Sequence, residues 1–256
     1  MNILLIGDVV GKVGRRAMAC LLPEIRRQHE LDLVIANGEN AAGGKGITPD
    51  TAEEMFEAGV EIITSGNHIW RYREIYPYLD SEAPLLRPLN YPEGAPGRGF
   101  IARDGVGVIN LIGRTFMPGT LDCPFRAADE ALAGLGDPRI IIVDMHAEAT
   151  SEKAALAWYL DGRVSAVIGS HTHIPTADTR LLPKGTAFVT DVGMVGPRDS
   201  ILGMETQPVI EAFLSQLPTR FATDERGPSV FNSVLVQVDD ESGRATSIQR
   251  IDSEVA

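Results

Sequence analysis

Short apolar runs that end in polar residues recur along the chain, and they predict buried strands. Five of them lead within a few residues to a side chain that can bind a metal, and they cover residues 2–7, 31–36, 62–63, 140–143 and 164–169. Stretches with the spacing of amphipathic helices lie between them, at about 14–29, 48–58, 126–135 and 150–160. Strands that alternate with helices over such short intervals predict an α/β protein.

Two hairpins are predicted outside this alternation. Residues 100–103 and 106–112 flank Asp104-Gly105, a dipeptide typical of tight hairpin turns. Residues 233–238 and 245–251 flank a short polar turn near the end of the chain. We therefore expect antiparallel strands in addition to the alternating elements.

The remaining segments are predicted as a strand at 187–190, a mobile loop at 191–197 and a helix at about 208–217. Prolines and glycines recur between residues 81 and 99, which predicts an irregular connection. Because candidate ligands lie on both sides of this connection, we expect one domain over residues 1–256.

Local signals refine the ends of two helices. Thr48 followed by Pro49 is typical of an N-cap with proline in the first helical position. Thr150 or Ser151 is expected to cap the helix that begins near residue 150. In the first helix, Pro23 is expected to cause a kink.

Composition narrows the classes of function. The formal net charge of −12 argues against binding long nucleic acid or an anionic membrane, although metal ions could supply positive charge for a small phosphorylated substrate. The two cysteines cannot build a disulfide framework, and Cys20 is expected to be a buried thiol. The chain has neither an 18-residue apolar run nor a basic leader, so we expect a cytoplasmic protein.

Candidate metal ligands follow the five apolar runs. Four of the five histidines are among them, whereas His29 is expected to be a surface residue at a helix end. Side chains at alternate positions of an extended segment point the same way, so His171 and His173 could aim both imidazoles at one point. The full set is Asp8, Glu39, Asn40, Asn67, His68, His146, His171 and His173.

This set predicts a transition-metal site. The carboxyl ends of strands in an open α/β sheet gather at one edge, where ligands bind. A mixture of carboxylate, amide oxygen and imidazole suits Mn, Fe or Zn better than Ca or Mg. Eight candidates exceed the needs of one ion and fit two ions that share a carboxylate, as in phosphatases, nucleases and aminopeptidases.

Each residue taken alone has an ordinary structural explanation. Asp8 could cap a helix, Asn40 and Asn67 could be turn residues, and His68 or His146 could lie on the surface. Their joint occurrence after five strands favours the metal site. The glycines at 7, 11 and 14 do not form the G-x-G-x-x-G pattern of a dinucleotide site.

Two further residues are weaker candidates. Arg114 is expected either to hold a phosphate or to be a solvated loop residue. Asp191 is expected to orient a ligand histidine without binding the metal itself.

The ordered motifs resemble those of the calcineurin-like metallophosphoesterases. The motifs are Gly7-Asp8, Gly38-Glu39-Asn40, Gly66-Asn67-His68, His146 and Gly169-Ser170-His171-Thr172-His173. Two positions depart from the family pattern, because Val10 stands where the first motif usually has histidine and Glu39 where the second usually has aspartate. The combination resembles the small bacterial YmdB-like branch, which hydrolyses cyclic nucleotides.

The resemblance implies roles for these residues. One metal would take Asp8, Glu39 and His173, with Asn40 in place of the missing histidine. The other would take Asn67, His146 and His171, with Glu39 bridging the pair. A hydroxide that bridges the metals would attack phosphorus in line, and His68 would donate a proton or stabilise the transition state.

The resemblance also implies a four-layer αββα sandwich of two mixed β-sheets flanked by helices. The expected activity is metal-dependent hydrolysis of a phosphodiester, most simply a 2′,3′- or 3′,5′-cyclic nucleotide, with two ions of Fe or Mn, or alternatively Zn. A phosphomonoesterase or 5′-nucleotidase on the same metals, and a metal-binding regulatory protein with incidental hydrolysis, remain as alternatives. The hairpins and the proline-rich connection are compatible with a homo-oligomer interface, but no feature fixes the subunit number.

Overall fold

The computed structural model describes residues 1–255, which form two β-sheets and six helices. Both sheets are buried on two faces, because branched apolar residues fill nearly every position of their central strands. The helices are α1 (Gly11–His29), α2 (Pro49–Glu57), α3 (Ile75–Leu79), α4 (Pro124–Gly134), α5 (Thr150–Leu160) and α6 (Thr206–Ser215).

The first sheet is mixed and centres on the N-terminal strand β1 (Asn2–Val9), which pairs in parallel with β2 (Leu33–Asn37). Strand β3 (Ile62–Thr64) continues the parallel part beside β2. The other strands of this sheet are β10 (Met194–Pro197), β11 (Ser229–Phe231), β12 (Ser233–Val238), β13 (Ala245–Arg250) and β14 (Ser253–Val255).

The second sheet has the order β4-β5-β6-β7-β9-β8. Its four inner strands run in parallel, whereas the two edge strands are antiparallel to their neighbours. The strands are β4 (Phe100–Arg103), β5 (Val106–Ile112), β6 (Ile140–His146), β7 (Ala166–Ser170), β8 (Arg180–Leu181) and β9 (Ala187–Val189).

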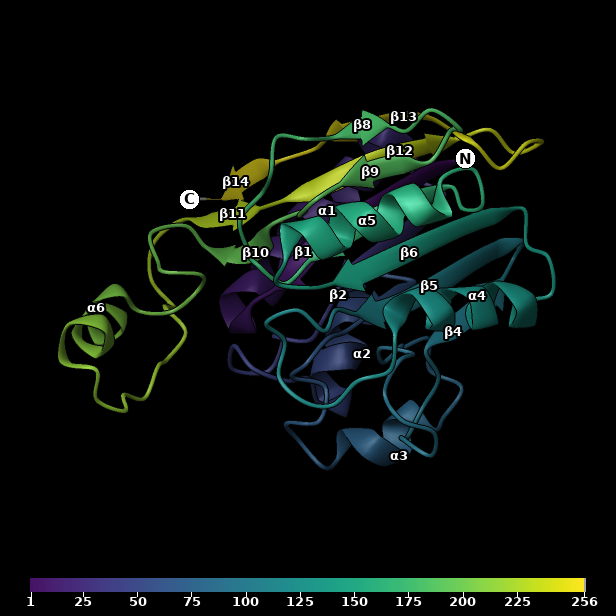
Figure 1. Cartoon of the computed structure of the whole chain (residues 1–256). Helices are drawn as coiled ribbons and strands as arrows, with labels where there is room; N and C mark the ends of the chain where they lie inside the picture. Colours follow the sequence, from purple (N-terminus) through teal and green to yellow (C-terminus); the bar gives the residue numbers. More distant parts are fainter. Residues whose placement is uncertain (256) are drawn as a thin grey trace.

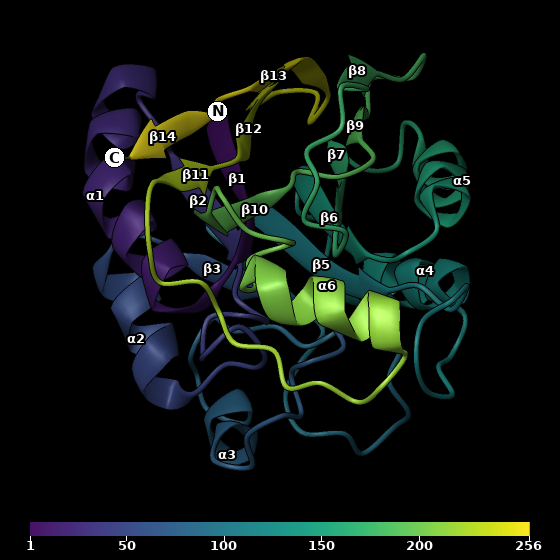
Figure 2. The same cartoon turned by 90° about the vertical axis from the view of Figure 1, so that its left-hand side faces the viewer.

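The sheets pack face to face with helices outside, and Figure 2 shows α1 and α2 on one flank and α4 and α5 on the other. Alternate residues of β1 separate the layers: Ile3 and Leu5 face the second sheet, whereas Leu4 and Ile6 pack with α1 and α2. The four-layer αββα sandwich of two mixed sheets is confirmed.

The parallel strands of both sheets deliver their carboxyl ends to the same side of the molecule, on the left in Figure 1. Helix α6 lies beyond these ends and apart from the packed layers, and among its ten residues only Val209 is buried. No helix within residues 1–255 combines the length and apolar character needed to cross a membrane.

Most local predictions agree with the structure. Both hairpins form, and Thr48 caps α2 in a capping box with Thr51. The proline-rich connection at residues 81–99 consists of turns, bends and one isolated bridge at Leu85, and the short helix α3 ends just before it. His29 is the last residue of α1, as expected.

Three local predictions were wrong. Residues 194–197 are not part of a mobile loop but form the buried strand β10, because β1 and β11 pair with them on either side. The N-cap of α5 is Ala149 and makes no side-chain cap bond, so neither Thr150 nor Ser151 caps it. Cys20 is exposed, because it lies on the solvent side of α1.

Candidate metal centre

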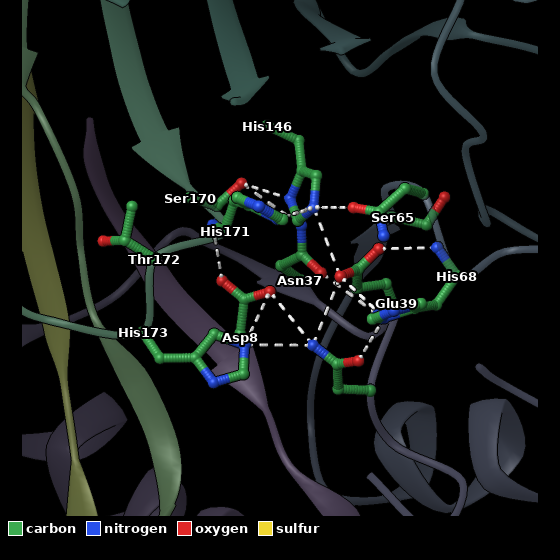
Figure 3. Close-up of polar contacts among 12 residues, drawn as sticks. Asp8, Asn37, Glu39, Ser65, His68, His146, Ser170, His171, Thr172 and His173 are labelled. Atoms are coloured by element: carbon green, nitrogen blue, oxygen red, sulfur yellow. Dashed lines mark hydrogen bonds and ion pairs between the residues drawn. The ribbon is translucent and has the colours of Figure 1, made fainter. Parts of the chain in front are cut away.

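The eight predicted site residues lie together at the carboxyl ends of the strands, and Figure 3 labels Asp8, Glu39, His68, His146, His171 and His173 among them. Asp8 lies within β1, one residue before its end, and His146 is the last residue of β6. The others follow strands β2, β3 and β7 directly in loops. Contacts of 3.8 Å or less join all of them into one cluster: Asp8, Glu39, Asn40, Asn67, His68, His146, His171 and His173.

Glu39 lies at the centre of the cluster and is 1% exposed. Its Oε1 atom is 3.2 Å from both His146 Nε2 and His68 Nδ1. Gly66 allows this close approach, because a Cβ atom there would lie 2.2 Å from His146 Nε2 and 2.4 Å from Glu39 Oε2. A side chain at position 66 would therefore push the two candidate ligands apart.

The two histidines that follow β7 contact different members of the cluster. His171 Nδ1 lies 3.0 Å from His146 Nε2, whereas His173 Nε2 lies 3.8 Å from Asp8 Oδ1. Their backbone is not extended, since φ is 101° at His171 and 65° at His173. The expectation that simple strand alternation aims both rings at one point was wrong, and a left-handed turn spreads them over a wider centre.

Asn40 lies between the carboxylates and His68. Its amide nitrogen is 3.1 Å from His173 Nε2 and 3.2 Å from Glu39 Oε1, and its oxygen is 2.8 Å from His68 Nδ1. The amide nitrogen therefore faces the centre. Ligation through oxygen requires a half-turn of the amide, which would present the NH₂ group to His68 Nδ1.

Burial and mutual charge shift the pKa values of the cluster strongly. Burial raises the pKa of Asp8 to about 6, against the opposing effects of His173 and His146. Burial alone would also raise the pKa of Glu39, but His146 and His68 hold it well below its usual range. Burial and the neighbouring His146 lower the pKa of His171 to about 3, which leaves this imidazole neutral and able to ligate.

The donor set fits transition-metal binding. One ligand atom from each of Glu39, His146 and His171 lies within 4.8 Å of the others, in buried or half-buried positions. A carboxylate with two imidazoles is the ligand chemistry of Zn, Fe and Mn sites. Asp8, Asn40 and His173 form an adjoining group of polar side chains beside Glu39.

The two weaker candidates, Arg114 and Asp191, lie at the edge of the cluster. Arg114 is exposed, and its backbone N–H donates to the Glu152 carboxylate at 3.0 Å. Asp191 is fully buried behind the histidine loop and accepts the backbone N–H of Thr172 at 3.0 Å. Asp191 thus contacts the backbone between the two histidines and not an imidazole.

Lys153 was missed by the sequence analysis, although it supports the same loop. Its ammonium group lies 2.7 Å from Asp191 Oδ2, and both side chains are 0% exposed. The signal in the sequence was a lysine within the apolar pattern of a helix. Asn37 and Ser170 were missed because isolated polar residues at strand ends are common in loops.

Replacing Lys153 by methionine is expected to destabilise the protein by about 3–5 kcal/mol, because it leaves the buried charge of Asp191 without its partner. Urea unfolding measures this effect. The double variant with Asp191→Asn should recover part of the loss, since it removes both charges. Equal stability of Lys153→Met and wild type would contradict this reading of the pair.

The metal-free protein is expected to lose stability as the pH rises from about 6.5 through about 9. Burial disfavours the His146 imidazolium, but Glu39, Asp8 and Asp144 outweigh it and raise the pKa of His146 from 6.5 to about 9. The folded state therefore holds this proton more tightly, and its contribution is complete below pH 6.5 and lost above the folded pKa. Urea unfolding with a chelator from pH 6.5 to 10 should show the decline, and a His146→Gln variant should show less of it; equal declines would refute the assignment.

Comparisons with known proteins agree with this geometry. A family model described as YmdB-like protein matches residues 4–251. This chain belongs to the YmdB-like family. Its similarity to a Bacillus subtilis protein named 2′,3′-cyclic-nucleotide 2′-phosphodiesterase is 48% identity over 256 residues, covering 98% of this chain and 96% of that relative.

Two solved structures resemble the YmdB-like chain over nearly its whole length. A Thermus thermophilus protein described as hypothetical has a TM-score of 0.92 and 45% identity, covering 99% of both chains. A Mycoplasma pneumoniae protein described as a novel phosphatase has a TM-score of 0.93 and 33% identity, covering 99% of this chain and 93% of the other. The predicted family is confirmed, and so is its class of activity, because the Bacillus subtilis relative is named as a phosphodiesterase and the Mycoplasma pneumoniae protein as a phosphatase.

Proposed function

We propose that this protein is a metal-dependent phosphodiesterase that hydrolyses 2′,3′-cyclic nucleotides. The observation that carries the proposal is the convergence of two carboxylates and three imidazoles from four strand ends, with His68 from a fifth strand end beside Glu39. The Bacillus subtilis relative supports the choice of substrate, since it is similar along the whole chain.

Two groups of residues would hold the metals. Asp8, Asn40 and His173 would hold one ion, and Asn67, His146 and His171 the other, with Glu39 shared between them. Two bound cations would neutralise the charge of the phosphate and acidify a water molecule. Iron or manganese suits these donors best, with zinc as the alternative.

His68 is placed for proton transfer. Its side chain is 31% exposed, whereas Glu39 beside it is almost fully buried, so His68 is the member of the pair that a substrate can reach. Its Nδ1 atom faces Asn40 Oδ1 at 2.8 Å, and this contact orients the ring. His68 would protonate the leaving oxygen or stabilise charge in the transition state.

A panel of substrates tests the proposal. We expect 2′,3′-cyclic nucleotides to give a higher kcat/KM than 3′,5′-cyclic nucleotides, p-nitrophenyl phosphate or 5′-nucleotides, and the product to be the nucleoside 3′-phosphate. Preference for the monoesters would favour the phosphomonoesterase alternative. One bound ion per chain without turnover would favour the regulatory protein.

A further inference from the structure

A cluster of buried polar side chains lies beneath the candidate metal centre, between the two sheets. Its four members come from β2, β3, β6 and β7, and each is at most 6% exposed: Asn37, Thr64, Asp144 and Ser170. Residues around them are largely apolar, so these polar groups depend on one another for hydrogen bonds. The cluster joins both sheets at the level of His146.

Asp144 is surrounded by hydrogen-bond donors. Its Oδ2 atom accepts from Thr64 Oγ1 at 2.5 Å and from Asn37 Nδ2 at 3.2 Å, and its Oδ1 atom accepts from Ser170 Oγ at 2.6 Å. Three donors directed at one carboxyl group match an ionised carboxylate, which can only accept. The Ser170 hydroxyl therefore donates its hydrogen to Asp144.

The direction of the Ser170–Asp144 hydrogen bond determines whether His146 Nδ1 donates or accepts. Ser170 Oγ lies 3.0 Å from His146 Nδ1, and with its hydrogen directed at Asp144 it presents a lone pair to the ring. Nδ1 must then carry a hydrogen and donate it. Nε2 remains as the nitrogen that faces Glu39, Asn67 and His171.

Asn37 would favour the opposite arrangement in the absence of Ser170. Its oxygen accepts the backbone N–H of Glu39 at 3.0 Å, which turns its NH₂ group towards His146 Nδ1 at 3.4 Å. A ring that faced only this donor would keep its lone pair on Nδ1 and its hydrogen on Nε2. The Ser170 hydroxyl therefore determines whether the hydrogen of the His146 ring is on Nδ1 or on Nε2.

We propose that Asp144, acting through the Ser170 hydroxyl, is a positioning residue that holds His146 with Nδ1–H directed away from the centre and Nε2 free to ligate. The inference rests on the proposed metal centre and adds the group that prepares one of its ligands. Hydrogen bonds to the second ring nitrogen of a ligand histidine typically contribute about 10–100-fold in metal affinity.

Zinc binding by Ser170→Ala, Asp144→Asn and the double variant tests the proposal, with affinity measured by chelator competition. Ser165→Ala is the matched control, because Ser165 is 1% exposed, precedes the same strand β7 at its far end and bonds only to backbone atoms. We expect each single variant to lose about 10–100-fold in affinity for one of two zinc ions. The double variant should lose no more than Ser170→Ala alone, since Asp144 acts through Ser170.

A spectroscopic measurement separates this role from general loosening of the fold. In zinc-loaded protein with ¹⁵N-labelled histidine, ring ¹H–¹⁵N correlations should show His146 protonated at Nδ1 in wild type and control, and this signal should weaken in Ser170→Ala. Zinc affinity within twofold of the control for both single variants, or additive losses in the double variant, would overturn the inference. Failure of the wild-type chain to bind zinc, iron or manganese would instead overturn the proposed function.

Discussion

Replacing Glu39 by glutamine is expected to lower kcat/KM for bis-p-nitrophenyl phosphate by at least about 10³-fold, which corresponds to about 4 kcal/mol of transition-state stabilisation. Glutamine keeps the shape of Glu39 but removes the charge that lies between His146 and His68, 3.2 Å from each. Because this carboxylate is the one that both proposed metals share, its loss weakens both halves of the centre. Steady-state kinetics with added manganese or iron measures the effect.

Glu61→Gln provides a matched control for this experiment. The Glu61 carboxylate lies at the opposite end of β3, where it accepts from the backbone of Val34 at 2.7 Å and from Arg26 at 2.7 Å. Its amide variant should keep kcat/KM within about twofold of wild type, as expected for a partly exposed ion pair far from the centre. Glu39→Gln activity above a tenth of the wild-type value would contradict the bridging role.

His68→Ala is expected to lower kcat for a 2′,3′-cyclic nucleotide by about 10²–10⁴-fold. The reason is that hydrolysis of the cyclic ester expels a strongly basic alkoxide, which needs a proton. The nitrophenolate that leaves bis-p-nitrophenyl phosphate is far less basic, so the same variant should lose much less activity on that substrate. Comparing kcat on the two substrates measures the difference.

His29→Ala is the control for His68, because His29 is the one histidine outside the cluster. It should leave both substrates unaffected. Equal losses on the two substrates in His68→Ala would show that His68 stabilises charge or holds Asn40 in place and does not donate a proton.

The sequence predicted where the candidate ligands lie, because strand ends are readable from local patterns. A short apolar run closed by Gly-Asp or Gly-Asn-His indicates a strand and its final polar residue, and the parallel order of strands then brings these residues together. The positions of Asp8, Glu39, Asn67 and His146 followed from this argument. The resemblance to metallophosphoesterases supplied the two-sheet arrangement, which local patterns alone did not specify.

The sequence did not predict how the ligands are held. The left-handed loop at His171 and His173 is held by backbone N–H groups of His171 and Thr172, which donate to the carboxylates of Asp8 and Asp191. These carboxylates lie 163 and 19 residues away from their donors in the chain. Strand β10 depends on pairing with β1 across more than 180 residues, whereas its own residues look like a flexible loop. Non-local contacts of this kind leave no periodic signal.

Buried polar residues were missed for a related reason. Asp144 lies within an apolar strand and Lys153 within a helix, and either position alone is compatible with a solvent-exposed side chain. Their roles follow from partners on other strands, namely Ser170 for Asp144 and Asp191 for Lys153. Charged residues inside otherwise apolar elements are the one signal that could have identified them.

We propose that segments from five strand ends enclose a pair of cations. Elemental analysis of protein purified without added metal, and again after incubation with iron, manganese or zinc and removal of excess, tests it most directly. We expect two ions per wild-type chain and a reduced content in Glu39→Gln. A wild-type chain that retains no ion under any of these conditions would contradict the account.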